Sequence, residues 1–436
     1  MLGLRLIDDA EFIIARLNES GYEAYAVGGC VRDAVMGRQP KDWDITTSAA
    51  PDEVRRVFSR TVNTGGKHGT ITVLIKNKAY EVTTYRVDGK YSDGRRPDIV
   101  TYTSTLAEDL GRRDFTINAI AYHYSEGFVD PFGGIGDIEK RIIRTVGRPD
   151  ERFGEDSLRM LRALRFRAQL GFEIESETYA SIIRNSALIE KISAERIRDE
   201  ILKILLSASP QGIMSVVLTG LMDYCYPRAA EYLRENADKI LPALTAGGWE
   251  ADPASNAVNR LTLLLCFMPE SQAAELLRGM RFDTKTIRAV SLRVRELSEK
   301  DSLFSRMLSN PSLYYVRKAM SRLNAGQLTD CLAVAEIFNR VDHGLRADIE
   351  TTVGKITAAG NCLNLSNLAI NGRDLIKAGF KPGKPTGDAL NAALDAVLRD
   401  PALNTKPTLL KLTLELLNAR NGPAPSDNPV PEVKIP

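Results

Sequence analysis

Strand and helix signals are distributed unevenly along the 436 residues of this chain. Within about the first 150 residues, β-rich stretches such as 69–76 and 79–86 alternate with helical segments. After Gly154, helical periodicity continues almost to the end, interrupted by Gly and Pro but with few strand-like runs. This asymmetry predicts an α+β fold in which a mixed sheet with helices is followed by all-α domains.

Turn residues and changes of periodicity place the element and domain boundaries. The predicted elements of the N-terminal part are helices over 8–19 and 31–36 and strands over 24–27, 44–47, 69–76, 79–86 and 127–129. The polar, Gly-rich segment 88–97 predicts a mobile loop, and Gly133-Gly134 predicts the turn that closes the α+β unit. We divide the chain into a head (1–147), a neck (148–206), a body (207–345), a tail (346–420) and a disordered, Pro-rich C-terminus (421–436).

Composition excludes several classes of protein. The chain has 44% apolar and 26% charged residues and a net charge of +2, so it is neither a membrane bundle nor a polycation. Its most apolar stretch, 261–268, is too short to span a membrane, and acidic residues interrupt the N-terminus where a signal peptide needs an apolar core. The five cysteines show no paired spacing, which predicts reduced thiols, no disulfide partner and a cytoplasmic protein.

Two carboxylates lie two positions apart in the segment Lys41-Asp42-Trp43-Asp44, at the start of a predicted strand. Side chains alternate along a strand, so Asp42 and Asp44 point to the same face. Like charges this close repel each other unless cations lie between them, and Mg²⁺ prefers oxygen ligands. The pair therefore predicts a Mg²⁺ site, although a solvated turn with two incidental acids has the same pattern.

A glycine pair stands upstream, where Gly28-Gly29 joins the strand 24–27 to the helix 31–36. Glycines let the backbone approach phosphate oxygens closely, and the N-terminal end of a helix favours an anion. Arg32 lies one turn after Gly29 on the same side. Together with the acids, these residues predict a triphosphate site. The alternatives are a tight turn and a surface salt bridge between Arg32 and Asp33.

A third acid, Glu81, lies in the β-rich stretch 79–86. An unpaired carboxylate is costly within a central strand, which favours a role for Glu81 beside Asp42 and Asp44 in the metal site. A solvent-facing position at the edge of the sheet is the alternative.

Four motifs occur in a fixed order: Gly28-Gly29-Cys30-Val31-Arg32-Asp33, Lys41-Asp42-Trp43-Asp44, 112–119 (RRDFTINA), and Glu155-Asp156-Ser157-Leu158-Arg159 followed by Arg162. With them the chain resembles the class II nucleotidyltransferases of the DNA polymerase β superfamily, and within that class the tRNA CCA-adding enzymes. Relatives of that family include CC-adding and A-adding enzymes and bacterial poly(A) polymerases. The resemblance implies a nucleotidyltransferase head that holds Mg²⁺, followed by helical domains that hold RNA.

The segment 155–170 predicts one continuous helix, on which Asp156, Arg159 and Arg162 follow one another at a spacing of three while Arg165 falls near the apolar stripe. A carboxylate accepts from an exocyclic amine and a guanidinium donates to a ring nitrogen, which suits cytosine and adenine but not uracil and guanine. The resemblance implies base reading by Asp156 and Arg159 and nucleotide binding by Arg162 and Arg165. An ordinary salt-bridge ladder is the alternative.

Further roles follow from the resemblance. Arg113 is expected to contact the nucleotide, and the loop 88–97 accompanies the ability to finish with A in the family. The segment 371–390 carries basic residues around glycines, which can approach a phosphate backbone closely. We expect Lys381 and Lys384 of this segment to bind RNA, unless the segment is a solvated linker.

The sequence therefore predicts an enzyme that uses CTP and ATP to add and repair the CCA at the tRNA 3′ end without a template. The alternatives are an A-adding enzyme or poly(A) polymerase and, in another class, an inactive RNA-binding protein on the same scaffold. Asp342-His343 has the reverse order of the His-Asp signature of metal phosphohydrolases, so hydrolase activity is not expected.

Overall fold

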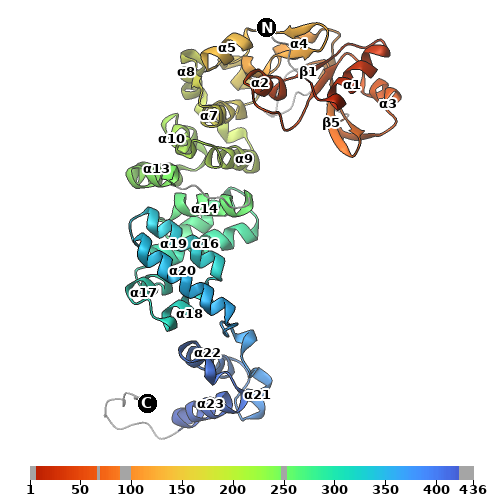
Figure 1. Ribbon diagram of the computed structural model, residues 1–436. Coiled ribbons are helices and arrows are strands. Elements are labelled where there is room, and N and C mark those ends of the chain that lie inside the picture. The colour runs from red at the N-terminus through yellow and green to blue at the C-terminus, as the bar shows by residue number, and fades with distance from the viewer. Residues whose placement is uncertain (1–5, 66–68, 89–99, 247–252, 422–436) are drawn as a thin grey trace. The chain divides into compact units, whose positions relative to one another are not determined.

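The protein is described here by a computed structural model, which covers residues 6–65, 69–88, 100–246 and 253–421. It confirms the predicted α+β part followed by helices (Figure 1). Among the described residues, the last strand ends at Ile174, and helices and turns make up the regular structure beyond it.

A seven-stranded mixed sheet, in the order β3-β4-β5-β2-β1-β8-β9, forms the centre of the N-terminal part. Its strands are β1 (Ala24–Val27), β2 (Ile45–Thr47), β3 (Thr61–Gly65), β4 (Thr70–Ile75), β5 (Lys78–Thr84), β8 (Ala121–His123) and β9 (Gly127–Val129). All four residues of β1 are buried, which suits its apolar sequence. Strands β2 and β5 pair in parallel with Ile45 beside Val82, so the preceding residues, Asp44 and Glu81, are neighbours where β2 begins.

Helices pack on this sheet and complete its core. They are α1 (Asp8–Glu19), α2 (Gly29–Val35), α3 (Pro51–Val57), α4 (Leu106–Gly111) and α5 (Gly134–Lys140), with the 3₁₀ turn η2 (Thr116–Asn118). Helix α1 buries one stripe of apolar residues at helical spacing, from Ala10 to Leu17. One buried cluster joins strands to α4 and consists of Tyr25, Val27, Tyr85, Leu106, Leu110, Ala119, Ala121 and Val146.

Two short ladders lie outside the main sheet. Strand β6 (Arg86–Asp88) pairs antiparallel with β7 (Val100–Tyr102), and β10 (Ile142–Ile143) pairs in parallel with β11 (Glu173–Ile174). The predicted loop 88–97 falls between β6 and β7, and from residue 89 onward it lies outside the described residues, as does the predicted disorder after residue 421.

The predicted continuous helix over 155–170 is wrong at its start. Helix α6 (Pro149–Glu155) ends before Asp156, which has an extended backbone with φ −137° and ψ 101°, and α7 (Leu158–Leu170) begins two residues later. The Asp156 carboxylate also accepts from the backbone N–H of Leu158 at 3.1 Å, which caps the new helix. Asp156 therefore does not share a helix with Arg159.

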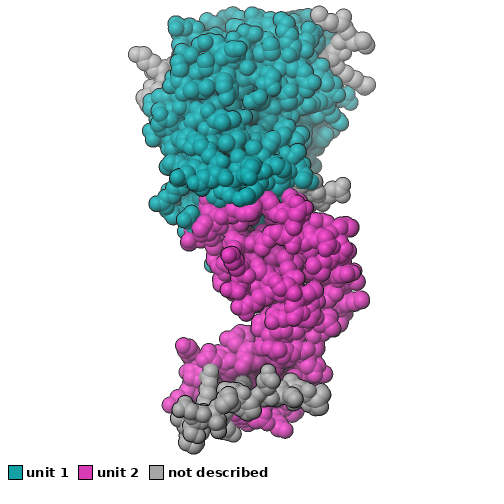
Figure 2. Space-filling view, turned by 90° about the vertical axis from the view of Figure 1, so that its left-hand side faces the viewer, with its two compact units in different colours: residues 1–264, 272–288 teal, residues 265–271, 289–436 magenta. Residues whose placement is uncertain are grey.

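Helices and 3₁₀ turns form the rest of the described chain. They are α8 (Ser176–Asn185), η3 (Ser186–Lys191), α9 (Ala194–Leu205), η4 (Pro210–Gly212), α10 (Ile213–Leu218), α11 (Leu221–Cys225), α12 (Pro227–Glu235), α13 (Ala237–Ala246), α14 (Pro253–Leu265), α15 (Glu270–Gly279), α16 (Thr284–Ser298), α17 (Leu303–Ser309), α18 (Leu313–Arg322), α19 (Ala325–Ile337), α20 (His343–Ala358), η5 (Leu365–Asn367), α21 (Gly372–Lys377), α22 (Lys384–Arg399), η6 (Pro401–Leu403) and α23 (Lys406–Asn421). The chain divides into two compact units, of which the first holds residues 1–264 and 272–288 and the second the remainder (Figure 2).

Within the second unit, the last helices have a core of their own. It contains Cys362, Ile370, Leu375, Phe380, Ala389, Ala393, Val397 and Leu409. Polar contacts connect this part to α18. The Asp395 carboxylate of α22 accepts from the Tyr314 hydroxyl at 2.7 Å and from Lys318 Nζ at 2.5 Å, and Arg317 Nε donates to the side chain of Asn361 at 3.0 Å.

Gly134 tests how closely α5 packs on the sheet domain. A Cβ at this position would overlap the backbone carbonyl of Thr116 and lie 2.8 Å from Cγ1 of Ile120. We expect Gly134→Ala to lower the free energy of unfolding by about 1–3 kcal/mol, since backbone cannot yield as a side chain can. Gly136→Ala, in the same helix but with nothing within 4 Å, is the control, and its unfolding midpoint should stay at or slightly above that of the wild type. Equal thermal midpoints for the two variants would contradict this packing.

Candidate active site

A cavity of about 470 Å³ lies in the first unit, where the sheet domain meets α7 and α9. We call it the site cavity. It is lined by Gly28, Gly29, Arg32, Asp44, Arg112, Arg113, Asp114, Asn118, Asp156, Arg159, Arg162, Phe166 and Arg196. Six of these thirteen residues are arginines, so the cavity is suited to a polyanionic ligand.

The glycine turn forms one wall of the site cavity. Gly28 has φ +83°, a conformation that favours glycine, and a Cβ there would lie 2.8 Å from Nη1 of Arg113. Arg32, one turn into α2, is only 8% exposed. Its Nε donates to Asp33 at 2.9 Å, as the salt-bridge alternative proposed, and its Nη1 also donates to the Asn118 side chain at 2.6 Å. Arg32 therefore lines the site cavity while it is paired with Asp33.

The three candidate metal ligands gather negative charge at the edge of the site cavity. Asp44 is accessible to solvent, but the surrounding protein desolvates its carboxylate and raises its pKa, and the charges of Glu81 and Asp42 raise this pKa further against the opposing effect of Arg113. A cation would relieve this repulsion, and carboxylate oxygens are suitable ligands for a hard divalent ion. Within the described part of the chain, no three His, Cys, Asp or Glu side chains form a preassembled metal cluster.

A buried carboxylate connects the strand after these acids to two arginines of the site cavity. Asp109 of α4 is fully buried and accepts hydrogen bonds from Thr46 Oγ1 at 3.1 Å, from Arg112 at 2.8 Å and from Arg113 at 3.3 Å. Burial alone would raise the pKa of Asp109, but the charges of Arg112 and Arg113 outweigh burial and lower it. Asp109 therefore stays ionised and holds Arg113 near Gly28 and Asp44.

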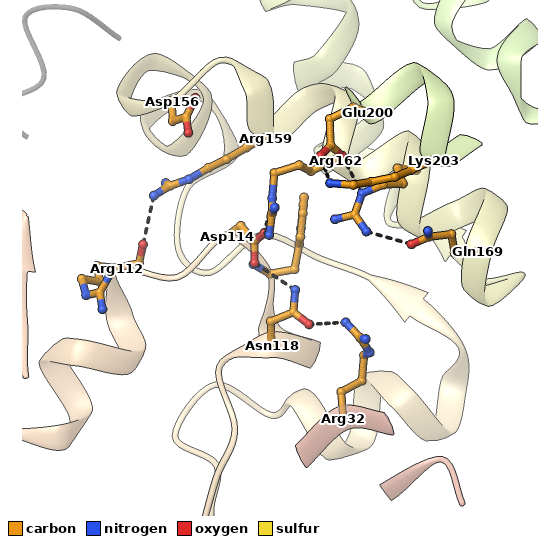
Figure 3. Close-up of polar contacts among 12 residues, drawn as sticks. Arg32, Arg112, Asp114, Asn118, Asp156, Arg159, Arg162, Gln169, Glu200 and Lys203 are labelled. Carbon is orange, nitrogen blue, oxygen red and sulfur yellow. Dashed lines mark hydrogen bonds and ion pairs between the residues drawn. The ribbon is translucent and has the colours of Figure 1, made fainter. Parts of the chain in front are cut away.

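A second buried carboxylate, Asp114, connects the head to α7 (Figure 3). Its Oδ2 accepts two hydrogen bonds from Arg162, at 2.8 and 2.6 Å, and its Oδ1 accepts from Asn118 at 3.0 Å. Burial would raise the pKa of Asp114, but Arg162 and Asn118 together lower it to about 2. Asn118 in turn bonds Arg32, so one chain of polar contacts runs from α2 to α7.

The two residues expected to read the base have different partners. Arg196 of α9 holds the Asp156 carboxylate at 2.9 Å. Arg159 pairs with Glu155 at 2.6 Å and donates to the backbone carbonyl of Arg112 at 3.0 Å. Asp156 and Arg159 therefore do not form the salt-bridge ladder along one helix that was the alternative interpretation of the sequence. Each of the two side chains is held by its own partner beside the site cavity.

Arg165 does not line the site cavity. It donates from Nε to Glu200 at 2.5 Å and from Nη1 to Gln169 at 2.7 Å, and only 8% of it is exposed. Its position near the apolar stripe of α7 agrees with this burial.

Glu81 and Asp42 are exposed near the edge of the cavity without lining it, whereas Gly29, Arg32, Arg113, Asp156, Arg159 and Arg162 all line it.

Sequence reasoning missed Arg196. Only the packing of α9 on α7 identifies it, since Glu200, one turn further along α9, is buried against Arg165. Arg196 lies on the same face of α9 as Glu200 and lines the site cavity. Sequence reasoning also missed Phe166, which lines the site cavity.

The remaining predicted site lies in the second unit. Lys381 and Lys384 are exposed, and Lys384 begins α22 directly after Gly383, which has φ +97°.

All five cysteines are free thiols, and burial raises the pKa of Cys30, next to the glycine turn, to about 11. No helix in the described ranges is long and apolar enough to cross a membrane.

Three family models match consecutive parts of the chain. They describe a poly A polymerase head domain (residues 24–144), a probable RNA and SrmB-binding site of polymerase A (171–233) and a tRNA nucleotidyltransferase domain 2 (255–413). The chain is 39% identical to the CCA-adding enzyme of Limosilactobacillus fermentum over 94% of its own length and 98% of that protein. It is 37% identical to the CCA-adding enzyme of Levilactobacillus brevis, over 91% and 95%.

Solved structures of similar proteins share the fold. The Bacillus stearothermophilus CCA-adding enzyme in complex with CTP matches with a TM-score of 0.77 and 32% identity, over 94% of this chain and 98% of that one. The Thermotoga maritima CCA-adding enzyme complexed with tRNA matches with a TM-score of 0.60 and 21% identity, over 95% and 97%, which is a likeness of fold alone.

Asp114 should make stability depend on pH in the acid range. Its folded pKa of about 2 lies below the ordinary 3.8, so its ionised form stabilises the fold by roughly 2 kcal/mol at neutral pH, and this contribution is lost as the pH falls from about 4 to about 2. The difference in unfolding free energy between wild type and Asp114→Asn should therefore shrink by about 1 kcal/mol between pH 7 and pH 3. Asp52→Asn, at an exposed ion pair with Arg55, is the control, and a difference for Asp114→Asn that does not change with pH would contradict the assignment.

Proposed function

This chain belongs to the family of CCA-adding enzymes, and we propose that its site cavity binds CTP and ATP for addition to the tRNA 3′ end. The observation that supports this role is the meeting of the glycine turn, Asp44, Asp156 and Arg159 around one cavity. Binding a triphosphate requires the glycine turn and Asp44, and choosing between bases requires Asp156 and Arg159. The resulting function is the addition and repair of CCA at the tRNA 3′ end without a template.

The phosphates are proposed to lie at the glycine turn. The backbone of Gly28 and Gly29 leaves room for phosphate oxygens, and Arg32 and Arg113 supply positive charge there. Asp109 holds Arg113 from behind, so its guanidinium is oriented before substrate binds. A preorganised cation stabilises the charge that develops on the phosphates as the tRNA 3′-hydroxyl attacks the α-phosphate and pyrophosphate leaves.

CCA-adding enzymes and nucleotidyltransferases in general use divalent metal ions. We propose Mg²⁺, held by Asp42 and Asp44 with Glu81 close by, which when bound lowers the pKa of the attacking hydroxyl and stabilises the transferred phosphoryl group. The raised pKa of Asp44 supports this assignment, because burial raises it most and the charges of Glu81 and Asp42 raise it further, which a bound cation would offset.

Base choice is proposed to come from Asp156 and Arg159. Asp156 accepts from the exocyclic amine that cytosine and adenine share, and Arg159 donates to the adjacent ring nitrogen. Arg196 and Glu155 hold these two side chains, so neither can turn freely to suit uracil or guanine. Arg162 lines the site cavity and is proposed to contact the nucleotide, whereas Arg165 pairs with Glu200 and is proposed to act on the nucleotide only through its support of α7.

The proposed division of labour assigns chemistry to the head (1–147), base recognition to the neck (148–206) and RNA binding to the body (207–345) and tail (346–420). The matched head region, 24–144, lies within the first of these. Lys381 and Lys384 are exposed beside a glycine turn and are proposed to contact tRNA phosphates. We propose that the enzyme acts in the cytoplasm.

Incorporation into a tRNA that lacks its last three nucleotides tests the function. With Mg²⁺, CTP alone should extend this tRNA by two nucleotides, and subsequent ATP should add one more. Asp44→Asn should reduce the rate at least a hundredfold because it removes a charged metal ligand, and EDTA should abolish the reaction until Mg²⁺ is restored. Failure to incorporate C, with A added to a tRNA ending in CC, would instead identify an A-adding enzyme. No incorporation at all would identify an RNA-binding protein.

Replacing Arg159 tests base choice. Arg159→Ala should lower the preference for CTP over UTP, measured as the ratio of kcat/KM values, by about tenfold or more, because a donor to the cytosine ring nitrogen is lost. Arg184→Ala, an exposed arginine of α8 that pairs with Asp150 and Glu177 outside the cavity, should leave the ratio unchanged. Unaltered discrimination in Arg159→Ala would exclude Arg159 from base reading.

A further inference from the structure

The aromatic ring of Phe166 lies where three arginines meet. The ring centroid is 3.9 Å from the guanidinium carbon of Arg165, 5.1 Å from that of Arg32 and 5.6 Å from that of Arg162. Phe166 is 4% exposed and lines the site cavity. Phe115 packs edge-on against it with centroids 5.8 Å apart, so the ring is held in one orientation.

Three guanidinium groups around one point repel one another. Each has a carboxylate partner, but these partners lie on separate elements: Asp33 on α2, Asp114 just after α4, and Glu200 on α9. The face of an aromatic ring has negative electrostatic potential and attracts cations without requiring a fixed hydrogen-bond geometry. The Phe166 ring is therefore an attractive contact that all three cations share.

The Phe166 ring also adds a second connection between two ends of the site cavity that hydrogen bonds already link. Arg32 donates to Asn118 at 2.6 Å, Asn118 donates to Asp114 at 3.0 Å, and Arg162 donates to Asp114 at 2.6 Å (Figure 3). Arg162 and Phe166 are one turn apart on α7, and the Phe166 ring contacts Arg32 at the start of this chain of hydrogen bonds. A shift of Arg32 would therefore disturb two connections to α7. One is the chain of hydrogen bonds through Asn118 and Asp114, and the other is the cation–π contact with Phe166.

We propose that Phe166 is a positioning residue, which holds Arg32 and Arg162 by cation–π attraction and so couples the phosphate end of the cavity to the base-reading helix. This inference rests on the proposed function, because the two arginines need preorganisation only if the cavity binds a nucleoside triphosphate. Phe166 acts through arginines and not on the base. Its loss should weaken CTP and ATP binding equally and leave the choice between CTP and UTP unchanged.

The test varies the ring's electrostatic potential at nearly constant shape. Phe166 in the full-length protein is replaced by mono-, di- and trifluorophenylalanine, and the Kd for CTP is measured by calorimetry in Mg²⁺ buffer without tRNA. The Kd should rise with each fluorine and reach about tenfold above wild type, equivalent to ~1.4 kcal/mol, and Phe166→Leu should weaken binding at least as much. A Kd that stays constant across the fluorinated series would overturn the proposal.

Phe172→Leu is the matched control. Phe172 is an equally buried ring in the same unit, with Arg141 at 5.9 Å, but it does not line the site cavity. Its variant should bind CTP as the wild type does. A change in the CTP-to-UTP ratio of kcat/KM in the fluorinated proteins would also overturn the proposal, because it would indicate direct contact with the base.

The same proteins separate this inference from the proposed function. Incorporation of C and A by the wild type tests the function alone. A wild type that adds both nucleotides, combined with a constant Kd across the fluorinated series, refutes the role of Phe166 and leaves the function standing. A wild type that binds no CTP refutes both.

Discussion

The ion pair between Asp114 and Arg162 joins the two kinds of structure in this chain. Asp114 follows the sheet domain's α4, and Arg162 lies on the first long helix beyond that domain. Removing one partner of such a buried pair leaves an uncompensated charge, so α7 cannot move away from the head without a large energetic cost. The side chains that border the site cavity from α7 depend on this connection for their place opposite the glycine turn.

Charge in the site is separated by position, although the net charge of the whole chain is only +2. Acids that repel one another lie at one edge, where Asp44 has a raised pKa, and arginines line the remaining wall. Each cavity arginine discussed above is held by a carboxylate or carbonyl of the protein, as Arg113 is by Asp109 and Arg159 by Glu155. Preorganised cations need little rearrangement when a polyphosphate binds, which is the usual origin of electrostatic catalysis.

Sequence reasoning predicted much of the fold, because its strongest signals were local. Helix α1 and strands β1 and β9 were predicted to the residue, since apolar spacing and turn residues mark them clearly. It missed β3, whose sequence Thr-Val-Asn-Thr-Gly has little apolar character and is a strand because β4 pairs with it. The break at Asp156 was missed because helical periodicity continued across it. The hydrogen bond from the Leu158 N–H to Asp156 is local, but the ion pair between Asp156 and Arg196 depends on tertiary structure. Seven of the predicted site residues on the cavity wall belong to sequence motifs, but Arg196 belongs to none, and only the packing of α9 on α7 identifies it.

The last helices of the second unit have their own hydrophobic core, and their seam with α18 is made by polar groups around Asp395. A segment with a core of its own and polar contacts at its boundary is organised as a module. Substitutions on its exposed surface can accumulate without disturbing the buried ion pairs of the catalytic unit. Evolution can therefore alter the surface of this segment while the residues around the site cavity stay the same.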